Sequence, residues 1–340
     1  MTPRSRSTGD AVRRREDLFR SLRQKTSNPR ILLTGKNGQI GRELERILAA
    51  TTELKALGRQ DVDLTDADGI RDAIRAFKPH LVLNAAGYTA VDKAESEEAL
   101  AHKINADAPG IMAEEAKKIG AALVHYSTDY VFDGCKDQPY IEEDAAHPLS
   151  AYGRTKLAGE KAVEQAGCRY TIFRTGWVYA THGKNFLLTI LRLAGEREEI
   201  RVVRDQIGAP TWSKAIAEAT AKIVLDEWHR AGSEMFAERT GIYHMTAAGQ
   251  TSWYEFAVAI IEKARNAENG PEWLGGTSRE RPLKVQRILP VATEDYGAPA
   301  RRPAYSLLSN ARLRATFGAS LADWRIQLQT AWGLRTVDRG

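Results

Sequence analysis

Residues 31–41 read Ile-Leu-Leu-Thr-Gly-Lys-Asn-Gly-Gln-Ile-Gly, and residues 42–48 continue Arg-Glu-Leu-Glu-Arg-Ile-Leu. A short apolar run, three glycines and then apolar residues at helical spacing predict a strand, a tight turn and a helix. Such a turn lets the backbone approach an anion, while the helix start offers free N–H groups and the positive end of its dipole. Gly35, Gly38 and Gly41 are spaced one residue wider than the usual dinucleotide fingerprint, and we predict that they line a nucleotide-binding turn.

The rest of the chain alternates between short apolar runs and stretches with helical spacing. Strands are predicted at 54–57, 81–86, 121–127, 170–175, 200–203 and 241–245, with helices at 66–77, at 105–119, from 212 and at 253–264. Alternating strands and helices imply right-handed crossovers and a mainly parallel sheet that is covered on both faces. We therefore predict an α/β protein with a Rossmann-like, doubly wound parallel sheet.

The predicted fold divides the chain into unequal parts. Residues 30–175 are expected to form a Rossmann domain that binds NAD(P), to which later segments around 200–250 return. Residues 176–340 are expected to form mainly a smaller C-terminal substrate-binding domain. Residues 1–29 form a basic extension that we expect to be disordered.

Composition excludes several classes of protein. The chain has 340 residues, of which 43% are hydrophobic, so it can bury a sizeable core without a disulfide framework. No apolar run approaches the roughly 20 residues that cross a bilayer, so no membrane insertion is expected. Cys135 and Cys168 are too few and too isolated for a structural zinc site, and we predict reduced thiols and a cytoplasmic location.

The net charge of +5 comes from one end of the chain. Residues 1–30 carry nine basic and three acidic side chains, which leaves 40 basic and 41 acidic side chains in the remainder. A groove that tracks phosphates along a nucleic acid needs a basic face on the folded domain. Because the body of the chain is close to neutral, we predict no nucleic-acid partner.

The segment after the second predicted strand bears on the choice of cofactor. In a doubly wound sheet the ligand lies beyond the carboxyl ends of the strands, and residues 58–63 read Gly-Arg-Gln-Asp-Val-Asp there. Arg59 could pair with the 2′-phosphate of NADP, whereas an acidic residue would bind the ribose hydroxyls of NAD. We predict NADPH, with NADH left open, and place Asp63 near the adenine. The alternative for Arg59 is a solvated side chain in a loop.

Two segments supply candidate catalytic groups. Residues 126–134 read Tyr-Ser-Thr-Asp-Tyr-Val-Phe-Asp-Gly, and Tyr152 and Lys156 follow at helical i, i+4 spacing, so that they share a helix face. A free tyrosine has a pKa of about 10, and a nearby ammonium group is expected to lower it. Thr128 would hold a carbonyl oxygen, Tyr152 would protonate it, and Lys156 would tune the tyrosine and hold the cofactor ribose. A nicotinamide cofactor supplies the hydride that no side chain can provide.

Together these motifs resemble the extended short-chain dehydrogenase/reductases and, among them, the dTDP-4-dehydrorhamnose reductases. The resemblance runs from about Ile31 to Ser309. The matching stretches are 35–41, 84–95, 127–134, 152–160, 174–179, 205–211 and 302–303. Gly87 stands where relatives often carry Ala or His, and the arginine-rich extension is not part of the family pattern.

The resemblance implies a set of binding residues and a reaction. Around the cofactor it places Gln39, Ile40, Ala85, Ala86, Gly87, Tyr126, Tyr152 and Lys156, and around the sugar nucleotide it places Thr128, Asp129 and Trp177. The reaction would be the NADPH-dependent reduction of dTDP-4-dehydro-6-deoxy-L-mannose to dTDP-L-rhamnose, the last step in making that sugar donor. Some relatives hold Mg²⁺ between two subunits, so a homodimer with Mg²⁺ is implied, but no metal ligand is assigned.

Two alternatives share the scaffold. A sugar-nucleotide dehydratase or epimerase would use the same tyrosine, but dehydratases of this group usually carry an Asp-Glu pair after the threonine, and here Tyr130 follows Asp129. A non-catalytic regulatory subunit, like the beta subunit of methionine adenosyltransferase, would bind NADP and a partner enzyme. Outside the motifs, residues 288–305 are expected to form an ordered loop, in which Arg302 could meet a diphosphate or form a surface ion pair.

Overall fold

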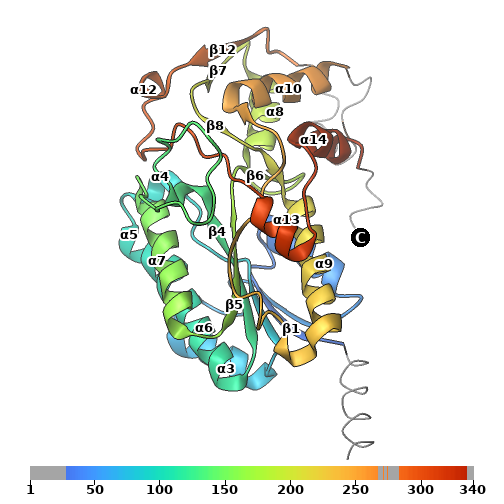
Figure 1. The fold of residues 1–340 in the computed structure, drawn as a ribbon. Helices are drawn as coiled ribbons and strands as arrows, with labels where there is room; N and C mark the ends of the chain where they lie inside the picture. The colour runs from blue at the N-terminus through green and yellow to red at the C-terminus, as the bar shows by residue number, and fades with distance from the viewer. Residues whose placement is uncertain (1–27, 267–270, 272–273, 275–282, 335–340) are drawn as a thin grey trace, which may run out of the picture.

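The structure, a computed structural model, is built on a six-stranded parallel sheet (Figure 1). It describes residues 28–266, 271, 274 and 283–334, so the predicted extension lies outside the described residues except for its last two. The strands lie in the order β10 (Gly241–His244), β5 (Arg169–Thr175), β4 (Ala122–Thr128), β3 (Leu81–Asn84), β1 (Arg30–Thr34) and β2 (Glu53–Leu57). The strand order reverses between β1 and β3, which makes that crevice the expected ligand position in such a sheet.

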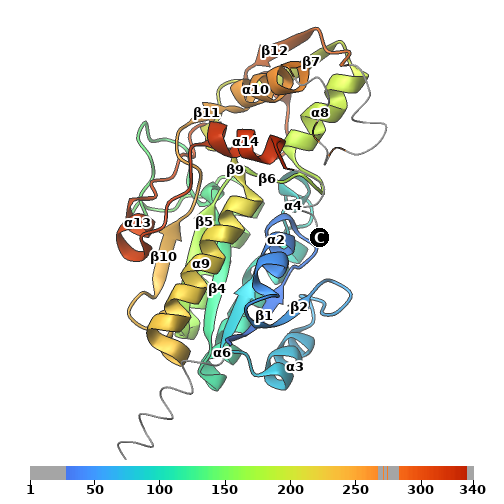
Figure 2. The same cartoon turned by 90° about the vertical axis from the view of Figure 1, so that its right-hand side faces the viewer.

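Helices cover both faces of the sheet, as Figures 1 and 2 show. One face carries α3 (Ala67–Phe77), α6 (Ala108–Ile119) and α7 (Ala151–Ala166), and the other carries α2 (Gln39–Leu48) and α9 (Ser213–Ala231). Successive strand residues point to opposite faces, so Leu32 packs into one apolar cluster and Leu33 into the other. Burial on both sides explains the almost continuous apolar runs. The predicted Rossmann-like doubly wound fold is confirmed.

A smaller layer lies at one end of the sheet (Figure 2). Its core joins side chains of α8 (Phe186–Glu196), α10 (Trp253–Asn266) and α14 (Trp324–Trp332) to a separate parallel pair, β7 (Glu199–Val203) with β12 (Arg287–Val291). The strand predicted at 200–203 therefore exists, but its assignment to the main sheet is wrong. Its partner comes from a segment about 90 residues later, which local periodicity does not reveal.

Short elements connect these parts. They are α4 (Val91–Ala94), α5 (Glu98–His102), η2 (Asp129–Val131), β6 (Val178–Tyr179), β8 (Ile207–Gly208), β9 (Thr211–Trp212), η3 (Gly232–Glu234), β11 (Thr251–Ser252), α12 (Thr293–Tyr296) and α13 (Ala311–Phe317). The segment predicted as a loop at 288–305 begins instead with most of β12, followed by α12. The division of the chain into a 30–175 and a 176–340 domain stays a prediction.

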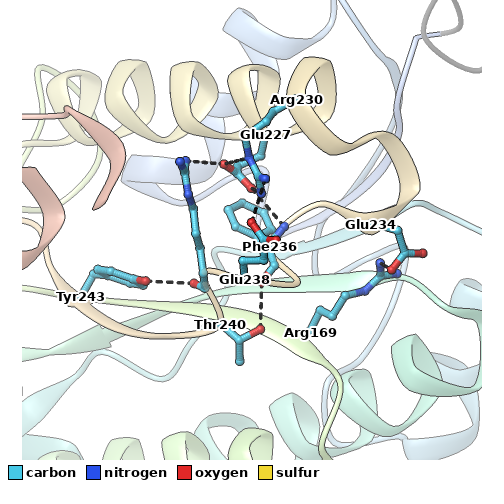
Figure 3. Close-up of polar contacts among 9 residues, drawn as sticks. Arg169, Glu227, Arg230, Glu234, Phe236, Glu238, Thr240 and Tyr243 are labelled. Atoms are coloured by element: carbon cyan, nitrogen blue, oxygen red, sulfur yellow. Dashed lines mark hydrogen bonds and ion pairs between the residues drawn. The ribbon is translucent and has the colours of Figure 1, made fainter. Parts of the chain in front are cut away.

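A buried carboxylate fixes the end of α9 and the return of the chain to the sheet (Figure 3). Glu227 accepts hydrogen bonds from Arg230, from Arg239 and from the N–H of Phe236. Burial opposes its ionisation, but the hydrogen bonds from Arg230 and Phe236 together with the charges of Arg239 and Arg230 outweigh burial, and the net pKa of the carboxyl is lowered. The loop after α9 is thereby tied down just before β10 enters the edge of the sheet.

Helix α7 and the segment before α6 approach each other closely. The helix predicted at 105–119 begins instead as a π-helical segment, η1 (Lys103–Asp107), and becomes α-helical only at Ala108. A Cβ atom on Gly159 would lie 2.0 Å from the carbonyl oxygen of Asn105. The glycine therefore allows the backbone of η1 to lie against α7, which carries the candidate catalytic pair.

We expect Gly159→Ala to lower the free energy of unfolding by at least about 2 kcal/mol, because the methyl group would meet a backbone carbonyl that has little room to move. Gly195→Ala in α8 is the matched control, since its added Cβ meets nothing within 4 Å. That variant should raise stability by up to about 1 kcal/mol through helix propensity. Urea unfolding of both variants measures the difference, and equal stabilities would contradict the proposed close approach.

Candidate functional site

Two turns meet where the strand order reverses. Gly35 follows β1 with φ +81°, and a Cβ atom there would lie 2.6 Å from the N atom of Ala86 and 2.7 Å from the carbonyl carbon of Ala85. Strand β3 ends at Asn84, so Ala85 and Ala86 lie in a turn and not in the predicted strand 81–86. The N–H of Ala85 is held by the carbonyl of Thr34 at 3.1 Å. The glycine turn and the 85–87 turn thus form one continuous backbone surface.

The start of α2 fits the pyrophosphate of a dinucleotide. Its N-cap, Gly38, has no side chain that could occupy the free N–H groups. A Cβ atom on Gly41 would lie 2.0 Å from the carbonyl oxygen of Gly35, so glycine is required for the tight packing of the turn on its helix. The buried Oε1 of Gln39 has no hydrogen-bond partner among the described residues. Ile40 follows it and packs against the apolar core.

Helix α7 brings Tyr152 and Lys156 to the end of β4. The side chain of Ser150 caps the helix by accepting the N–H of Gly153 at 3.2 Å. A Cβ atom on Gly153 would lie 2.3 Å from the carbonyl oxygen of Tyr130, so the first turn of α7 presses on the loop that follows β4. The i, i+4 pair therefore faces the sheet edge and not the solvent.

The Lys156 amine lies beneath the 85–87 turn. Its Nζ donates to the carbonyl oxygen of Tyr126 at 2.5 Å and lies 3.2 Å from Nε2 of His125. A Cβ atom built on Gly87 would be 4.0 Å from this Nζ, so the second turn lies directly over the amine. Burial lowers the pKa of Lys156 to about 8, although Glu160 opposes the shift.

Tyr126 contributes its backbone to this arrangement, while its ring points elsewhere. The side chain packs into the core on the α9 face, where its hydroxyl donates to Oγ1 of Thr220 at 2.7 Å. Its carbonyl oxygen holds Lys156. The predicted role of Tyr126 beside the cofactor therefore rests on its backbone in this structure.

Tyr152, Thr128 and Asp129 form a second polar group at the end of β4. A hydrogen bond links the hydroxyls of Tyr152 and Thr128, and Thr128 donates to Oδ1 of Asp129 at 3.0 Å. Burial raises the pKa of Tyr152 to about 12, with the hydrogen bond between the Tyr152 and Thr128 hydroxyls opposing the shift. The expectation that Lys156 lowers this pKa is wrong here, because burial dominates and Nζ is directed at Tyr126 and His125.

Asp129 is enclosed on several sides. Its carboxylate would lie 2.5–2.8 Å from a Cβ atom on Gly176, and its Oδ2 has no hydrogen-bond partner among the described residues. Burial raises the pKa of Asp129 to about 6, opposed by hydrogen bonds from Ser306 and Thr128. Its neighbour Ser127 is also buried, with an unpartnered Oγ.

Trp177 lies between this group and the smaller layer. Its φ of 53° is left-handed, and its indole stacks on that of Trp253 with centroids 3.6 Å apart and planes at 3°. A Cβ atom on Gly208 would lie 2.5 Å from the Trp177 ring. Local packing therefore holds Trp177 in an unusual conformation, at the place where the resemblance expects a sugar nucleotide.

The predicted residues after β2 are exposed. Arg59 and Asp63 lie in the loop that follows Leu57, and Asp63 accepts the N–H of Thr65 at 2.9 Å. Sequence reasoning missed Lys36, which forms an ion pair with Asp61 at 2.7 Å, while Asp61 also accepts the N–H of Gly58. This pair joins the glycine turn to the end of β2. The lysine within the glycine motif was the available signal.

Of the two readings for Arg302, the structure shows an ion pair. Its guanidinium binds Asp92 of α4 at 2.9 Å and is hydrogen-bonded to Tyr130. The Tyr130 ring meets that of Tyr152 edge-on with centroids 5.9 Å apart. Arg302 thereby ties the late segment to the wall of the site.

Sequence reasoning also missed His125 and Asn105. His125 lies within an otherwise apolar strand, and a polar residue in such a run was the signal. Asn105 is fully buried, accepts the N–H of Tyr88 at 2.8 Å and donates to Thr155 at 3.2 Å. His125 contacts the Lys156 amine, and Asn105 joins the backbone after the 85–87 turn to α7. The roles assigned to the predicted site residues stay predictions.

In residues 28–266, 271, 274 and 283–334 no group of three or more His, Cys, Asp or Glu side chains could hold a metal ion. Within the same residues no helix is both long and apolar enough to pass through a bilayer.

Known proteins similar to this chain include several named dTDP-4-dehydrorhamnose reductase. The family model described as the RmlD substrate binding domain matches residues 29–334. A dTDP-4-dehydrorhamnose reductase of Burkholderia thailandensis is 48% identical over 296 residues, covering 87% of this chain and 95% of that one. The Escherichia coli K12 protein of the same name is 41% identical over 300 residues, covering 87% and 94%. The crystal structure of the Bacillus anthracis dTDP-4-dehydrorhamnose reductase in complex with NADP matches with a TM-score of 0.77 and 34% identity, covering 89% and 98%.

The buried carboxyl of Asp129 gives a pH-dependent prediction. Its pKa of about 6 exceeds that of an unfolded aspartate, so the folded state binds the proton more tightly and loses stability as pH rises from about 4 to about 6. Asp129→Asn cannot ionise. The difference in free energy of unfolding between Asp129→Asn and the parent should therefore shift in favour of the variant by up to about 2–3 kcal/mol as the pH rises through this window. At higher pH this difference should stay constant.

Urea unfolding at several pH values between 4 and 8 measures this gain. Asp63→Asn is the control, because the backbone hydrogen bond from Thr65 lowers the pKa of Asp63, and that variant should show no gain. If Asp129→Asn and the parent lost stability in parallel, the carboxyl of Asp129 would ionise normally in the folded protein.

Proposed function

Because the chain belongs to the dTDP-4-dehydrorhamnose reductase family, we propose that it reduces the C4 ketone of dTDP-4-dehydro-6-deoxy-L-mannose to dTDP-L-rhamnose with NADPH, the last step of dTDP-rhamnose biosynthesis. Membership makes it an NAD(P)H-dependent oxidoreductase. One observation supports the proposal at the level of residues: the hydroxyls of Tyr152 and Thr128 are hydrogen-bonded to each other, and Lys156, one turn further along α7, lies beneath the 85–87 turn that adjoins the glycine turn.

Each group has a task in the proposed reaction. A nicotinamide cofactor supplies a hydride to the C4 carbon when it is bound. Tyr152 donates its phenolic proton to the ketone oxygen, and a raised pKa keeps that proton in place at neutral pH until the oxygen gains negative charge. The Thr128 hydroxyl, which is hydrogen-bonded to Tyr152, would turn its one proton from Asp129 to the same oxygen. Lys156 holds the ribose side of the cofactor from beneath Gly87.

The substrate sugar is proposed to lie between Thr128, Asp129 and Trp177. The unpartnered buried oxygens of Ser127 and Asp129 support this position, because buried polar atoms usually have a partner. A protonated Asp129 could donate a hydrogen bond to a sugar oxygen, and an ionised one could accept a hydrogen bond from a hydroxyl.

NADPH is proposed as the preferred cofactor. Arg59 lies exposed after β2, and Lys36 lies between the glycine turn and the end of that strand, so two cations are available to a 2′-phosphate. Lys36 is already paired with Asp61, which leaves Arg59 as the main candidate. The B. anthracis relative was solved in complex with NADP.

We also propose a homodimer with Mg²⁺ between its subunits, because the resemblance to the family implies both. A cytoplasmic location is supported by Cys135 and Cys168, which are both free thiols.

The dehydratase alternative is disfavoured at the site itself. The position after Asp129 holds Tyr130, whose ring packs on Tyr152 and whose hydroxyl binds Arg302, so no carboxylate lies there. An epimerase would regenerate its cofactor within each cycle. Consumption of one NADPH for each sugar reduced would therefore separate a reductase from both alternatives.

We predict that Tyr152→Phe lowers kcat by about 100-fold or more, because the proton donor is lost while the ring remains. Tyr170→Phe is the matched control, since Tyr170 lies near the amino end of β5, whereas the site is at the carboxyl ends of the strands, and its hydroxyl donates to Glu164. Steady-state kinetics with enzymatically generated dTDP-4-dehydrorhamnose measure kcat, and circular dichroism checks the fold. Near-normal turnover by a folded Tyr152→Phe protein would remove Tyr152 from the mechanism.

We predict that Arg59→Ala raises the KM for NADPH about tenfold or more and leaves the KM for NADH within about twofold, because one charged hydrogen-bond partner of the 2′-phosphate is lost. Arg71→Ala on α3 is the control, since Arg71 is already paired with Asp68 and with Glu115 of α6. The same initial-rate assay with both cofactors measures the ratio. Equal effects on the two cofactors would show that Arg59 does not discriminate between them.

A further inference from the structure

Three polar side chains form a buried row across adjacent strands. Thr34 on β1 is in register with Asn84 on β3, and Asn84 is in register with His125 on β4. All three are buried, and Asn84 and His125 are 0% exposed. They lie on the same sheet face as the apolar cluster of Leu32, with Thr34 and Asn84 as the last residues of their strands and His125 three residues before the end of β4. The row ends at Lys156, which α7 places against His125.

The contacts of Asn84 fix the orientation of its amide. Oδ1 accepts two hydrogen bonds, from the N–H of Ala86 at 3.1 Å and from the hydroxyl of Thr34 at 2.7 Å. The backbone N–H can only donate, so the atom facing it must be the oxygen. The NH₂ group of Asn84 therefore faces Nδ1 of His125 at 3.0 Å and donates to it. Nδ1 must accept, which places the proton of a neutral imidazole on Nε2.

This tautomer sets a condition on Lys156. The Nε2–H of His125 points at Nζ, 3.2 Å away. An uncharged amine has a lone pair that accepts this hydrogen bond, whereas an ammonium group has three donors and no acceptor. Burial lowers the pKa of His125 well below its usual value, and the charge of Lys156 lowers it further whenever the amine is protonated, so the ring stays neutral in both states of Lys156. The row as it stands is complete only when Lys156 is uncharged.

We propose that His125 is a positioning residue that favours the uncharged amine of Lys156 over the ammonium, with Asn84 setting the tautomer of the ring. Charging Lys156 requires the proton of His125 to move to Nδ1 and the amide of Asn84 to turn over. The N–H of Ala86 then loses its acceptor. This proposal rests on the role proposed for Lys156 in the reaction, but its hydrogen bonds can be tested without measuring turnover.

The other groups around Lys156 bear on its charge in known directions. Glu160, one turn along α7, favours the ammonium, but Arg174 binds that carboxylate at 2.7 and 2.9 Å. The carbonyl of Tyr126 accepts from either form of the amine. The 85–87 turn brings no charged side chain to this side. His125 is therefore the neighbour whose hydrogen-bonding role has to change with the charge.

A linkage follows between the turn and the amine. Ala86 belongs to the turn that the proposed function assigns to the cofactor, and its N–H is shared with the row through Asn84. A ligand at this turn that offers the Ala86 N–H another acceptor favours charged Lys156. NADP⁺ is the probe for this effect, and its binding should raise the pKa of Lys156.

Nuclear magnetic resonance tests the proposal without catalysis. Lysine labelled with ¹³C at Cε reports the titration of Lys156, which the spectrum of Lys156→Met assigns, and ¹⁵N-labelled imidazole reports the tautomer of His125. Above the titration midpoint of Lys156 we expect the proton of the His125 ring on Nε2, and below that midpoint we expect it on Nδ1. A His125 ring that keeps one tautomer throughout this titration would overturn the proposal.

Asn84→Asp reverses the row with almost no change in shape. A carboxylate still accepts the N–H of Ala86 but now also requires a donor from Nδ1, so Nε2 presents its lone pair to an ammonium group. The midpoint of Lys156 should rise by about one unit or more, and His125 should carry its proton on Nδ1 at every pH in the titration. Thr34→Val is the matched control, because Ala86 still orients Asn84, and neither the midpoint nor the tautomer should change.

The outcomes are distinct. A raised midpoint together with the Nδ1–H tautomer in Asn84→Asp supports the proposal, whereas a raised midpoint with the Nε2–H tautomer shows only the effect of an added charge and overturns it. An unchanged midpoint also overturns it. If Asn84→Asp does not fold, His125→Gln replaces it. The glutamine amide can offer its oxygen to the ammonium form of Lys156, so the titration midpoint of Lys156 should rise. An unchanged midpoint in His125→Gln refutes the role of His125. Full activity of Tyr152→Phe would instead refute the proposed function and leave these results standing.

Discussion

A lysine amine that is almost entirely removed from water has to find hydrogen-bond acceptors in the protein, and the geometry of the site depends on how Lys156 finds them. Its side chain is 4% exposed, and the acceptor within reach is the carbonyl of Tyr126 near the end of β4. That contact requires α7 to lie close to the sheet. Gly153 and Gly159 permit the approach, because each faces a carbonyl oxygen at a distance that excludes any side chain.

The parallel sheet makes this position chemically useful. The carboxyl ends of β1, β3 and β4 meet at one edge, so the glycine turn, the 85–87 turn and the Thr128 hydroxyl come together although they are far apart in the chain. The interior of the same strands is apolar on both faces. Three buried polar side chains interrupt this apolar interior, and they satisfy one another because Thr34, Asn84 and His125 lie in register across β1, β3 and β4. Buried polar groups that lacked such partners would be destabilising.

Much of the site could be predicted from the sequence because its signals are local. The glycines of the first turn and the spacing of Tyr152 and Lys156 each lie within a few residues, and the structure places them at one edge of the sheet. The pairing of β7 with β12 and the orientation of Tyr126 depend on distant partners, which periodicity cannot show. The direction of the Tyr152 pKa was mispredicted for the same reason: a neighbouring charge is visible in the sequence, but the extent of burial is not.

The substrate side of the site shows why chemistry is easier to predict than specificity. Asp129 is enclosed by Gly176 and Ser306, and Trp177 is held by Gly208 and Trp253, so each wall combines segments that are tens of residues apart. No short motif could encode such a surface. The groups that move the proton follow β4 and begin α7, where one strand and one helix fix them. A chain could therefore keep its proton-transfer groups while its late segments changed the sugar that it accepts, as the sharing of this scaffold among different sugar-nucleotide enzymes requires.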